Sequence, residues 1–199
     1  AAIDAATNGE TIVVDDGTYT GPGNIDLDTQ GKIITIKAQN AGPNTAVIDC
    51  GGNSAEPHRA FIFNGAEGAG TIIEGITIIN GYAAGDGGAI LCDGSSPTLT
   101  GLFFSGNEAA GNGGALAIGS GDTPVVENCV FTDNSAVYGG ALAATSTAAT
   151  VTGCTFYGNS ATSGAALACL GSGSLAVYNS LVSFSLTADA AYCASAGDA

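Results

Sequence analysis

The chain has 199 residues, of which 45% are hydrophobic and 11% are charged, and its formal net charge is −15. This length suffices for one domain with its own core, and so much hydrophobicity with so little charge excludes a disordered tail. Lys32, Lys37 and Arg59 are its three permanent cations. Nucleic acid is therefore excluded as a partner, because phosphate binding needs clustered Lys and Arg. No stretch approaches the ~18 apolar residues that span a bilayer, which excludes direct membrane insertion.

Residues 1–70 are predicted to form irregular opening coils. Asp26 and Asp28 alternate along a short predicted strand, where two carboxylates on one face are candidate calcium ligands. The alternative is that both carboxylates are simply solvated. His58 and Arg59 follow in a predicted loop before the strand 60–63, and Lys32 and Lys37 are predicted to be solvated side chains of an earlier strand.

Residues 71–170 carry a regular repeat in which a Phe is followed by an Asn three positions later. The repeated residues are Phe104, Phe131 and Phe156, with Asn107, Asn134 and Asn159. Their period of roughly 25 residues shows no helical pattern, and it accommodates three short strands and three bends. We therefore predict an all-β fold, a right-handed parallel β-helix of roughly seven to eight coils that forms a single domain over residues 1–199.

Stacked coils would give these repeated residues structural roles. The Phe residues are expected to fill the core in a column. The Asn residues are expected to form a ladder at one bend, because the side-chain amide satisfies turn backbone groups and Asn tolerates the left-handed conformation. The Gly-Gly-Ala units that follow are expected where the chain turns tightly and a larger side chain would clash.

Four of the six cysteines occupy positions from which coil-to-coil disulfides are predicted. Cys129 and Cys154 both lie two positions before a repeated Phe, and Cys169 and Cys193 are about one period apart. Equivalent positions on adjacent coils lie ~4.8 Å apart, which is within the Cα range of a disulfide. The alternative is a stack of reduced thiols that pack as small hydrophobic groups.

Three Gly-Gly-Ala units followed by Ile or Leu begin at Gly87, Gly113 and Gly139, and they alternate with the Phe-x-x-Asn units. Over residues 72–167 this pattern resembles the repeat of the chlamydial polymorphic outer-membrane proteins, from which the fourth unit departs by reading Gly-Ala-Ala-Leu from Gly164. The segments 11–19 and 46–52 resemble the opening coils of the pectate-lyase-like superfamily. These resemblances imply a β-helix that is secreted or on the cell surface, and that is structural or adhesive.

The enzyme alternative rests on Asp49, Asp86 and Asp93, which are predicted to approach one another on neighbouring coils near Arg59. Paired carboxylates of this kind serve inverting glycoside hydrolases. However, the chain lacks the Gly-His-Gly and Arg-Ile-Lys segments of polygalacturonases. We therefore expect no catalytic residues and no cofactor other than calcium. The cysteines lack the C-x-x-C spacing of a zinc site.

The predicted function is a non-catalytic extracellular module of a surface filament or larger surface protein, and the alternative is a polysaccharide-binding or polysaccharide-degrading domain. Six cysteines suit an oxidising compartment. Residues 171–199 read as degraded last coils, and no capping helix is indicated at either terminus. Because bare end coils expose strand edges, we expect end-to-end or lateral packing with copies or protein partners, or continuation as a piece of a longer chain.

Overall fold

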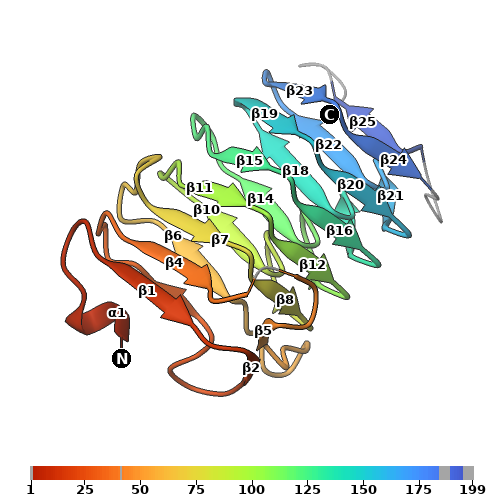
Figure 1. The fold of residues 1–199 in the computed structure, drawn as a ribbon. Coiled ribbons are helices and arrows are strands. Elements are labelled where there is room, and N and C mark those ends of the chain that lie inside the picture. Colours follow the sequence, from red (N-terminus) through yellow and green to blue (C-terminus); the bar gives the residue numbers. More distant parts are fainter. Residues whose placement is uncertain (1, 41, 184–188, 195–199) are drawn as a thin grey trace.

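The structure, a computed structural model, describes residues 2–40, 42–183 and 189–194. The chain winds through seven coils, so that each coil adds one strand to each of three seven-stranded parallel sheets (Figure 1). A fourth, four-stranded sheet runs along the middle coils. The prediction of an all-β parallel helix, with one coil for each period of the repeat, is confirmed.

The strands are grouped here by sheet, in the order in which one coil visits them. Sheet I contains β1 (Thr11–Val14), β4 (Thr35–Ala38), β7 (Ile72–Glu74), β11 (Thr98–Thr100), β15 (Val125–Glu127), β19 (Ala148–Thr152) and β23 (Ser174–Tyr178). Sheet II contains β2 (Gly17–Tyr19), β5 (Ala46–Asp49), β8 (Thr77–Ile79), β12 (Phe103–Ser105), β16 (Val130–Thr132), β20 (Thr155–Tyr157) and β24 (Leu181–Ser183). The small sheet III contains β9 (Tyr82–Ala83), β13 (Glu108–Ala109), β17 (Ser135–Tyr138) and β21 (Ser160–Ser163). Sheet IV contains β3 (Leu27–Asp28), β6 (Phe61–Phe63), β10 (Ile90–Cys92), β14 (Leu116–Ile118), β18 (Leu142–Thr145), β22 (Leu167–Leu170) and β25 (Ala191–Cys193).

The core consists of inward-facing columns in which each side chain lies over its equivalent in the next coil. In sheet I the column is Ile12, Ile36, Ile73, Leu99, Val126, Val151 and Val177. In sheet II it is Tyr19, Ile48, Ile78, Phe104, Phe131, Phe156 and Val182. The three Phe rings stack with centroids 4.7 and 4.8 Å apart, a spacing at which aromatic pairs add stability beyond the area they bury.

The corners between sheets are made by single left-handed residues. Between sheets I and II, Gly or Asn takes this conformation in five successive coils, at Gly75, Gly101, Asn128, Gly153 and Asn179. Between sheets II and III it falls on Asn80, Gly106, Asp133 and Gly158. One part of our expectation about the Asn ladder is wrong, namely that the ladder Asn residues themselves adopt the left-handed conformation. The residue before each ladder Asn adopts the left-handed conformation, because the Asn side chain itself points inward to bond the neighbouring coils.

The Gly-Gly-Ala units form the corner that leads into sheet IV. Their first glycine is left-handed, as at Gly113, where φ is 65°. Their second glycine has no room for a side chain, because a Cβ on Gly114 would lie 2.1 Å from the carbonyl oxygen of Gly140. Two different constraints therefore select the two glycines.

A short helix covers part of the N-terminal end, contrary to the prediction that no helix caps the solenoid. Helix α1 (Ala2–Ala5) buries Ile3 against the core. Lys32 is not a solvated side chain, because its Nζ donates to the carbonyl oxygens of Ile3 (2.7 Å) and Asp4 (3.2 Å). These carbonyls belong to the last turn of a very short helix, where a cation is favourable. The apolar pattern of so short a helix cannot be recognised in the sequence.

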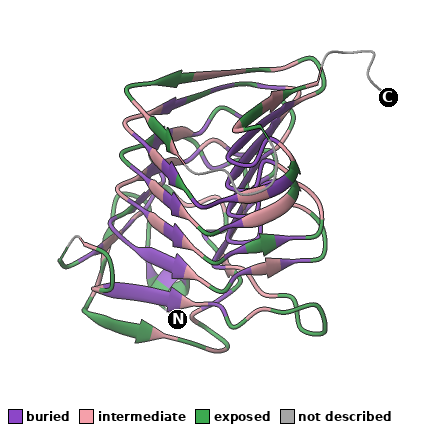
Figure 2. Ribbon diagram, turned by 90° about the vertical axis from the view of Figure 1, so that its right-hand side faces the viewer, coloured by how far each residue is buried: buried purple, intermediate pink, exposed green. Residues whose placement is uncertain are grey.

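Burial is greatest in the middle coils, while both end coils carry exposed segments (Figure 2). At the C-terminal end, the last strands of sheets I and II expose Val177, Tyr178, Leu181 and Val182. Among the described residues, no helix has the length and apolar character needed to cross a membrane.

Candidate functional site

The histidine and the arginine of the chain lie together with two aspartates. This group, called the charged cluster below, consists of Asp26, His58, Arg59 and Asp86. Asp26 precedes β3 in a left-handed conformation, with φ of 51°. Its Oδ2 lies 2.7 Å from Nδ1 of His58, and its Oδ1 accepts a hydrogen bond of 3.0 Å from the backbone N–H of Arg59. The Asp26 N–H in turn donates to the Arg59 carbonyl at 2.7 Å. These bonds hold the 51–59 loop of the second coil against the first coil.

The Arg59 guanidinium lies in a partly buried position between two coils. Burial lowers the pKa of Arg59, and the carboxylates of Asp26 and Asp86 partly offset this effect. Its Nη1 is buried without a hydrogen-bond partner among the described residues. Asp86 is itself engaged, because its Oδ1 accepts a hydrogen bond of 2.8 Å from the N–H of Asn112 in the next coil. The charged cluster thus joins three successive coils.

Of the three aspartates predicted near Arg59, the structure places Asp86 there and adds Asp26. Asp49 bonds elsewhere, since its Oδ1 accepts from Asn80 Nδ2 at 2.9 Å. Asp93 follows β10 and Asp86 precedes it, although both line one hollow of about 300 Å³ on the outer side of sheet IV. The three residues of β10 span roughly 10 Å of backbone at ~3.3 Å per residue, so Asp86 and Asp93 emerge at opposite ends of this strand. Catalysis by this pair stays an alternative that the geometry does not test.

The candidate calcium pair does not converge on one point. Both carboxylate oxygens of Asp26 are engaged by His58 and Arg59, whereas Asp28 Oδ1 accepts the N–H of Gln30 at 2.6 Å and stabilises a turn. The described residues contain no group of three or more His, Cys, Asp or Glu arranged to hold a metal ion. Calcium at this pair stays a prediction.

The ladder of Asn107, Asn134 and Asn159 is buried and continuous. Asn134 Oδ1 accepts from both the backbone N–H (3.0 Å) and the Nδ2 (2.9 Å) of Asn107, and Asn159 Oδ1 does the same for Asn134 at 3.0 Å each. Each Nδ2 also donates to a carbonyl of the preceding coil, for example Asn134 to Phe104 at 3.2 Å. All the amide groups serve the backbone or one another, so this column is structural.

A second buried polar column, at the corner between sheets IV and I, was missed from the sequence. Its centre is Glu67, whose carboxylate accepts four hydrogen bonds, from Thr29 Oγ1 (2.8 Å), Gly31 N–H (2.8 Å), Gly65 N–H (2.9 Å) and Ser95 Oγ (2.6 Å). Burial alone would raise the pKa of Glu67, but these bonds hold it below its ordinary value. From Glu67 onward the column members are about one repeat apart, but their residue types differ, so a search for like residues at one spacing does not reveal them. They are Thr29, Glu67, Ser95, Asp122 and Thr147.

All six cysteines are free thiols, so the reduced alternative describes this structure and the predicted disulfides are not formed. Cys129 and Cys154 are adjacent, with the Cys129 N–H 3.4 Å from Cys154 Sγ, and Cys169 is in register with Cys193. Like positions on stacked strands keep Cβ atoms about one strand spacing apart, ~4.8 Å, slightly beyond the usual ~3.5–4.5 Å of a disulfide. Strand stacking therefore brings thiols together without joining them.

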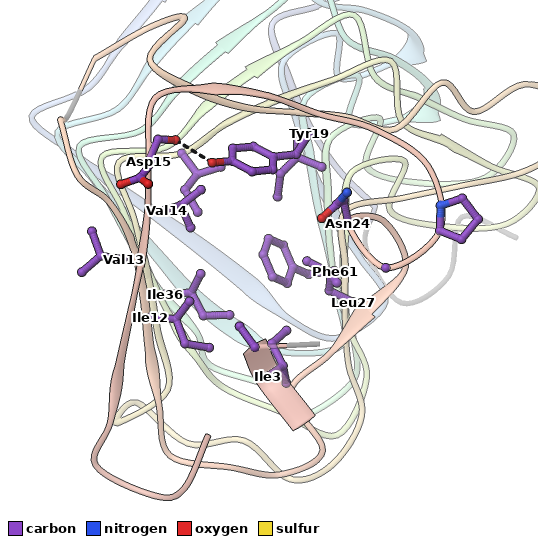
Figure 3. Close-up of a pocket in the computed structure, with 15 residues that line it drawn as sticks. Ile3, Ile12, Val13, Val14, Asp15, Tyr19, Asn24, Leu27, Ile36 and Phe61 are labelled. Atoms are coloured by element: carbon purple, nitrogen blue, oxygen red, sulfur yellow. Dashed lines mark hydrogen bonds between the residues drawn. The ribbon is translucent and has the colours of Figure 1, made fainter. Parts of the chain in front are cut away.

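Two of the cavities among the described residues are of interest as places for another molecule. The first, of about 410 Å³, lies at the N-terminal end, where apolar side chains from α1 and the first three coils surround it (Figure 3). In this view Ile3 and Tyr19 lie on opposite sides of the opening, and the Tyr19 hydroxyl donates to the Asp15 carbonyl at 2.9 Å. The second, of about 350 Å³, is a polar groove beside sheet III that includes Asn80, Tyr82 and Glu108.

Comparisons with known proteins identify a family and nothing narrower. A family model described as "Right handed beta helix region" matches residues 24–182. No curated protein and no solved structure matches the chain.

Proposed function

The chain belongs to the right-handed β-helix family, and from that premise we propose that it is a non-catalytic extracellular module, structural or adhesive, within a surface filament or a larger surface protein. The similarity of its Gly-Gly-Ala and Phe-x-x-Asn units to chlamydial polymorphic outer-membrane protein repeats supports a surface location. The surface location and the expected protein partners are both parts of this proposal.

One observation carries this proposal: Lys32 and His58, two of the basic groups that an enzyme would use, are bonded to other parts of the chain. Lys32 binds the helix α1 carbonyls, and His58 binds Asp26. Arg59 is partly buried between coils. A general acid or base must reach a substrate proton in an accessible site, and the N-terminal cavity is surrounded mainly by aliphatic residues. Such an arrangement favours rigidity over chemistry.

The test has two measurements. Antibody against the chain should label intact cells of the producing organism, and the purified chain should release no new reducing ends or unsaturated products from a panel of neutral and acidic polysaccharides. Turnover of any glycan that Asp86→Asn or Asp93→Asn abolishes would overturn the non-catalytic assignment. Labelling only after cells are broken would overturn the surface assignment.

The groove beside sheet III favours polysaccharide binding as a second candidate function. It combines the ring of Tyr82, the amide of Asn80 and the carboxylate of Glu108, and sugars pack against aromatic rings while hydrogen-bonding to amides and carboxylates. Affinity electrophoresis of the chain in gels containing neutral glycans tests it. Binding should retard the wild type, and Tyr82→Ala should migrate freely. Equal migration of both would remove this candidate.

A further inference from the structure

We propose that copies of this chain assemble head to tail, with the last coil of one copy seated on the N-terminal cavity of the next. The inference rests on the proposed structural function and specifies the partner and the two surfaces. Four observations carry it, namely the shape of the N-terminal end, the composition of the C-terminal end, the register between the two ends, and the distribution of charge.

The N-terminal end is covered on one side and open on the other. Helix α1 is held over the corner between sheets IV and I, where Lys32 bonds its carbonyls and Gln30 Nε2 bonds Asp4 at 3.0 Å. The opposite corner, between sheets I and II, borders the cavity of about 410 Å³ at Val14, Asp15 and Tyr19 (Figure 3). Nothing among the described residues covers this corner.

The C-terminal end is apolar at the same corner. Val177 and Val182 are the last members of the inward columns of sheets I and II, and they are 38% and 36% exposed. Beside them, Tyr178 is 58% exposed and Leu181 is 61% exposed. The C-terminal end of the core is therefore exposed to water at the corner between sheets I and II. At the N-terminal end, this is the corner that α1 does not cover.

The ladder register matches these two ends residue by residue. Followed along sheet I, the column of Tyr178 ends at Val13, which is itself 50% exposed. Followed along sheet II, the column of Leu181 ends at Thr18. Stacking a second copy by the same operation that relates neighbouring coils therefore places Tyr178 over Val13, Leu181 over Thr18, and the two valines over the cavity.

Charge disfavours contact between two N-terminal ends. Residues 1–30 contain six acidic side chains, whereas residues 171–199 contain two, Asp189 and Asp198. Two N-terminal ends would therefore repel each other more strongly than an N-terminal end and a C-terminal end. Two C-terminal ends would repel each other least, but their strands would run antiparallel and both cavities would stay unfilled. A head-to-tail contact repeats without closing, and so it generates a filament.

Two single-end variants test the proposal. Val13→Asp places a charge at the N-terminal surface and Leu181→Asp places one at the C-terminal surface, both at exposed positions where the fold tolerates it. Val137→Asp, at an exposed residue on β17 that is 37% accessible, is the matched control on the side of the rod. Folding of each variant is verified by circular dichroism and thermal unfolding. Val13→Ser and Leu181→Ser replace any Asp variant that does not fold.

In sedimentation velocity over increasing concentration, wild type and Val137→Asp should form growing oligomers, and each single-end variant should associate at least tenfold more weakly. An equimolar mixture of the two single-end variants should restore a dimer and stop there, because each supplies one intact end. Small-angle scattering of wild type should show increasing length at constant cross-section.

Each other outcome overturns the proposal. If only the Val13→Asp variant still self-associates, the C-terminal ends pair with each other. If only the Leu181→Asp variant still self-associates, the N-terminal ends pair with each other. A wild type that stays monomeric means that the two ends do not bind each other. A monomer found on intact cells without glycan turnover rejects this interface and leaves the proposed function standing.

Discussion

The middle coils, residues 72–170, and the opening coils, residues 2–63, solve the same packing problem differently. In the middle coils the sheet I register steps from Ile73 to Leu99 and on to Val126, about one repeat period each time, and like side chains lie over like. Between the second and third coils the step from Ile36 to Ile73 is about half as long again, because the 51–59 loop is inserted. The opening coils contain all three Lys and Arg residues and the N-terminal cavity. Repetition thus gives a closed core, whereas irregularity leaves room for charges and for an opening.

Asn134→Ala should break the regularity of the middle coils most severely. The substitution leaves the N–H and Nδ2 of Asn107 without their acceptor, and it removes the side-chain donor to the Oδ1 of Asn159. At ~1–3 kcal/mol for each unsatisfied buried group, we expect the free energy of unfolding to fall by about 4 kcal/mol. Urea denaturation followed by circular dichroism measures it. Asn40→Ala, in an exposed bond to Asp16, is the control and should change it by less than ~0.5 kcal/mol. Similar losses in both would contradict a structural ladder.

Glu67→Gln should destabilise the junction between the two regions by about 3 kcal/mol, because an amide turns one acceptor into a donor that faces other donors. Since the folded pKa of Glu67 is lowered, its stabilisation is complete above the unfolded value of ~4.3 and is lost as the pH falls through the folded value. Wild type should therefore lose more stability than Glu67→Gln on acidification below about pH 5. Parallel pH profiles would refute this.

Asp122, in the same column, gives the matched contrast. Burial raises its pKa, so its contribution has the opposite sign and stability falls as the pH rises through the folded value. Asp122→Asn keeps an oxygen acceptor for the Gly94 N–H, and it should leave the melting temperature at neutral pH equal to or above that of wild type. Thermal unfolding followed by circular dichroism measures this, and a clearly lower melting temperature would contradict it.

Exchanging side chains in the sheet II column sharpens the comparison further. Phe131→Ile removes a ring from a close stack and should cost about 2 kcal/mol. Ile48→Phe, in the same column of the opening coils, extends a ring toward the N-terminal cavity and should gain about 0.5–1 kcal/mol. Differential scanning calorimetry compares the two. Destabilisation by Ile48→Phe would mean that the cavity does not accept a ring.

Thiol labelling requires no substitution, and it should distinguish the exposed cysteine of the last coil from the buried cysteines of the other coils. Cys193 is exposed, whereas burial raises the pKa of Cys50 to about 12 and raises that of Cys92 as well. We expect rapid reaction of Cys193 with an aromatic disulfide reagent in the native state, and reaction of all six thiols in denaturant. If fewer than six thiols react in denaturant, and the mass of the intact protein is lower by two hydrogen atoms for each two unreacted thiols, the protein contains a disulfide instead.

The fold could be predicted because the repeat places chemically distinctive residues at one spacing. Phe131 and Asn134 recur with their Gly-Gly-Ala corner, and a period of roughly 25 residues admits few architectures. Helix α1 could not be predicted, because so short a segment contains too little pattern. The charged cluster was only partly foreseen. Asp26 reaches His58, 32 residues later in the chain, through coil stacking that depends on the length of an irregular insertion.

The Glu67 column illustrates why buried polar contacts escape sequence analysis. Its members are Thr, Glu, Ser, Asp and Thr, which share the repeat spacing from Glu67 onward but do not share a residue type. Each member supplies the hydrogen-bond donors or acceptors that its neighbours in the adjacent coils require, so the residue types differ although the position in the coil is the same. Hydrogen-bond complementarity does not require identity, whereas hydrophobic stacking of like side chains does.

The direction of the Asn ladder has a consequence for synthesis on the ribosome. Asn107 and Asn134 each donate to the oxygen of the Asn in the coil that follows in the chain, so the acceptor is translated later than its donors. At ~5–20 residues per second, the newest coil waits on the order of 1–5 s before the acceptor of its ladder N–H has been synthesised. Folding during translation therefore advances from the N-terminus, one coil behind the emerging chain.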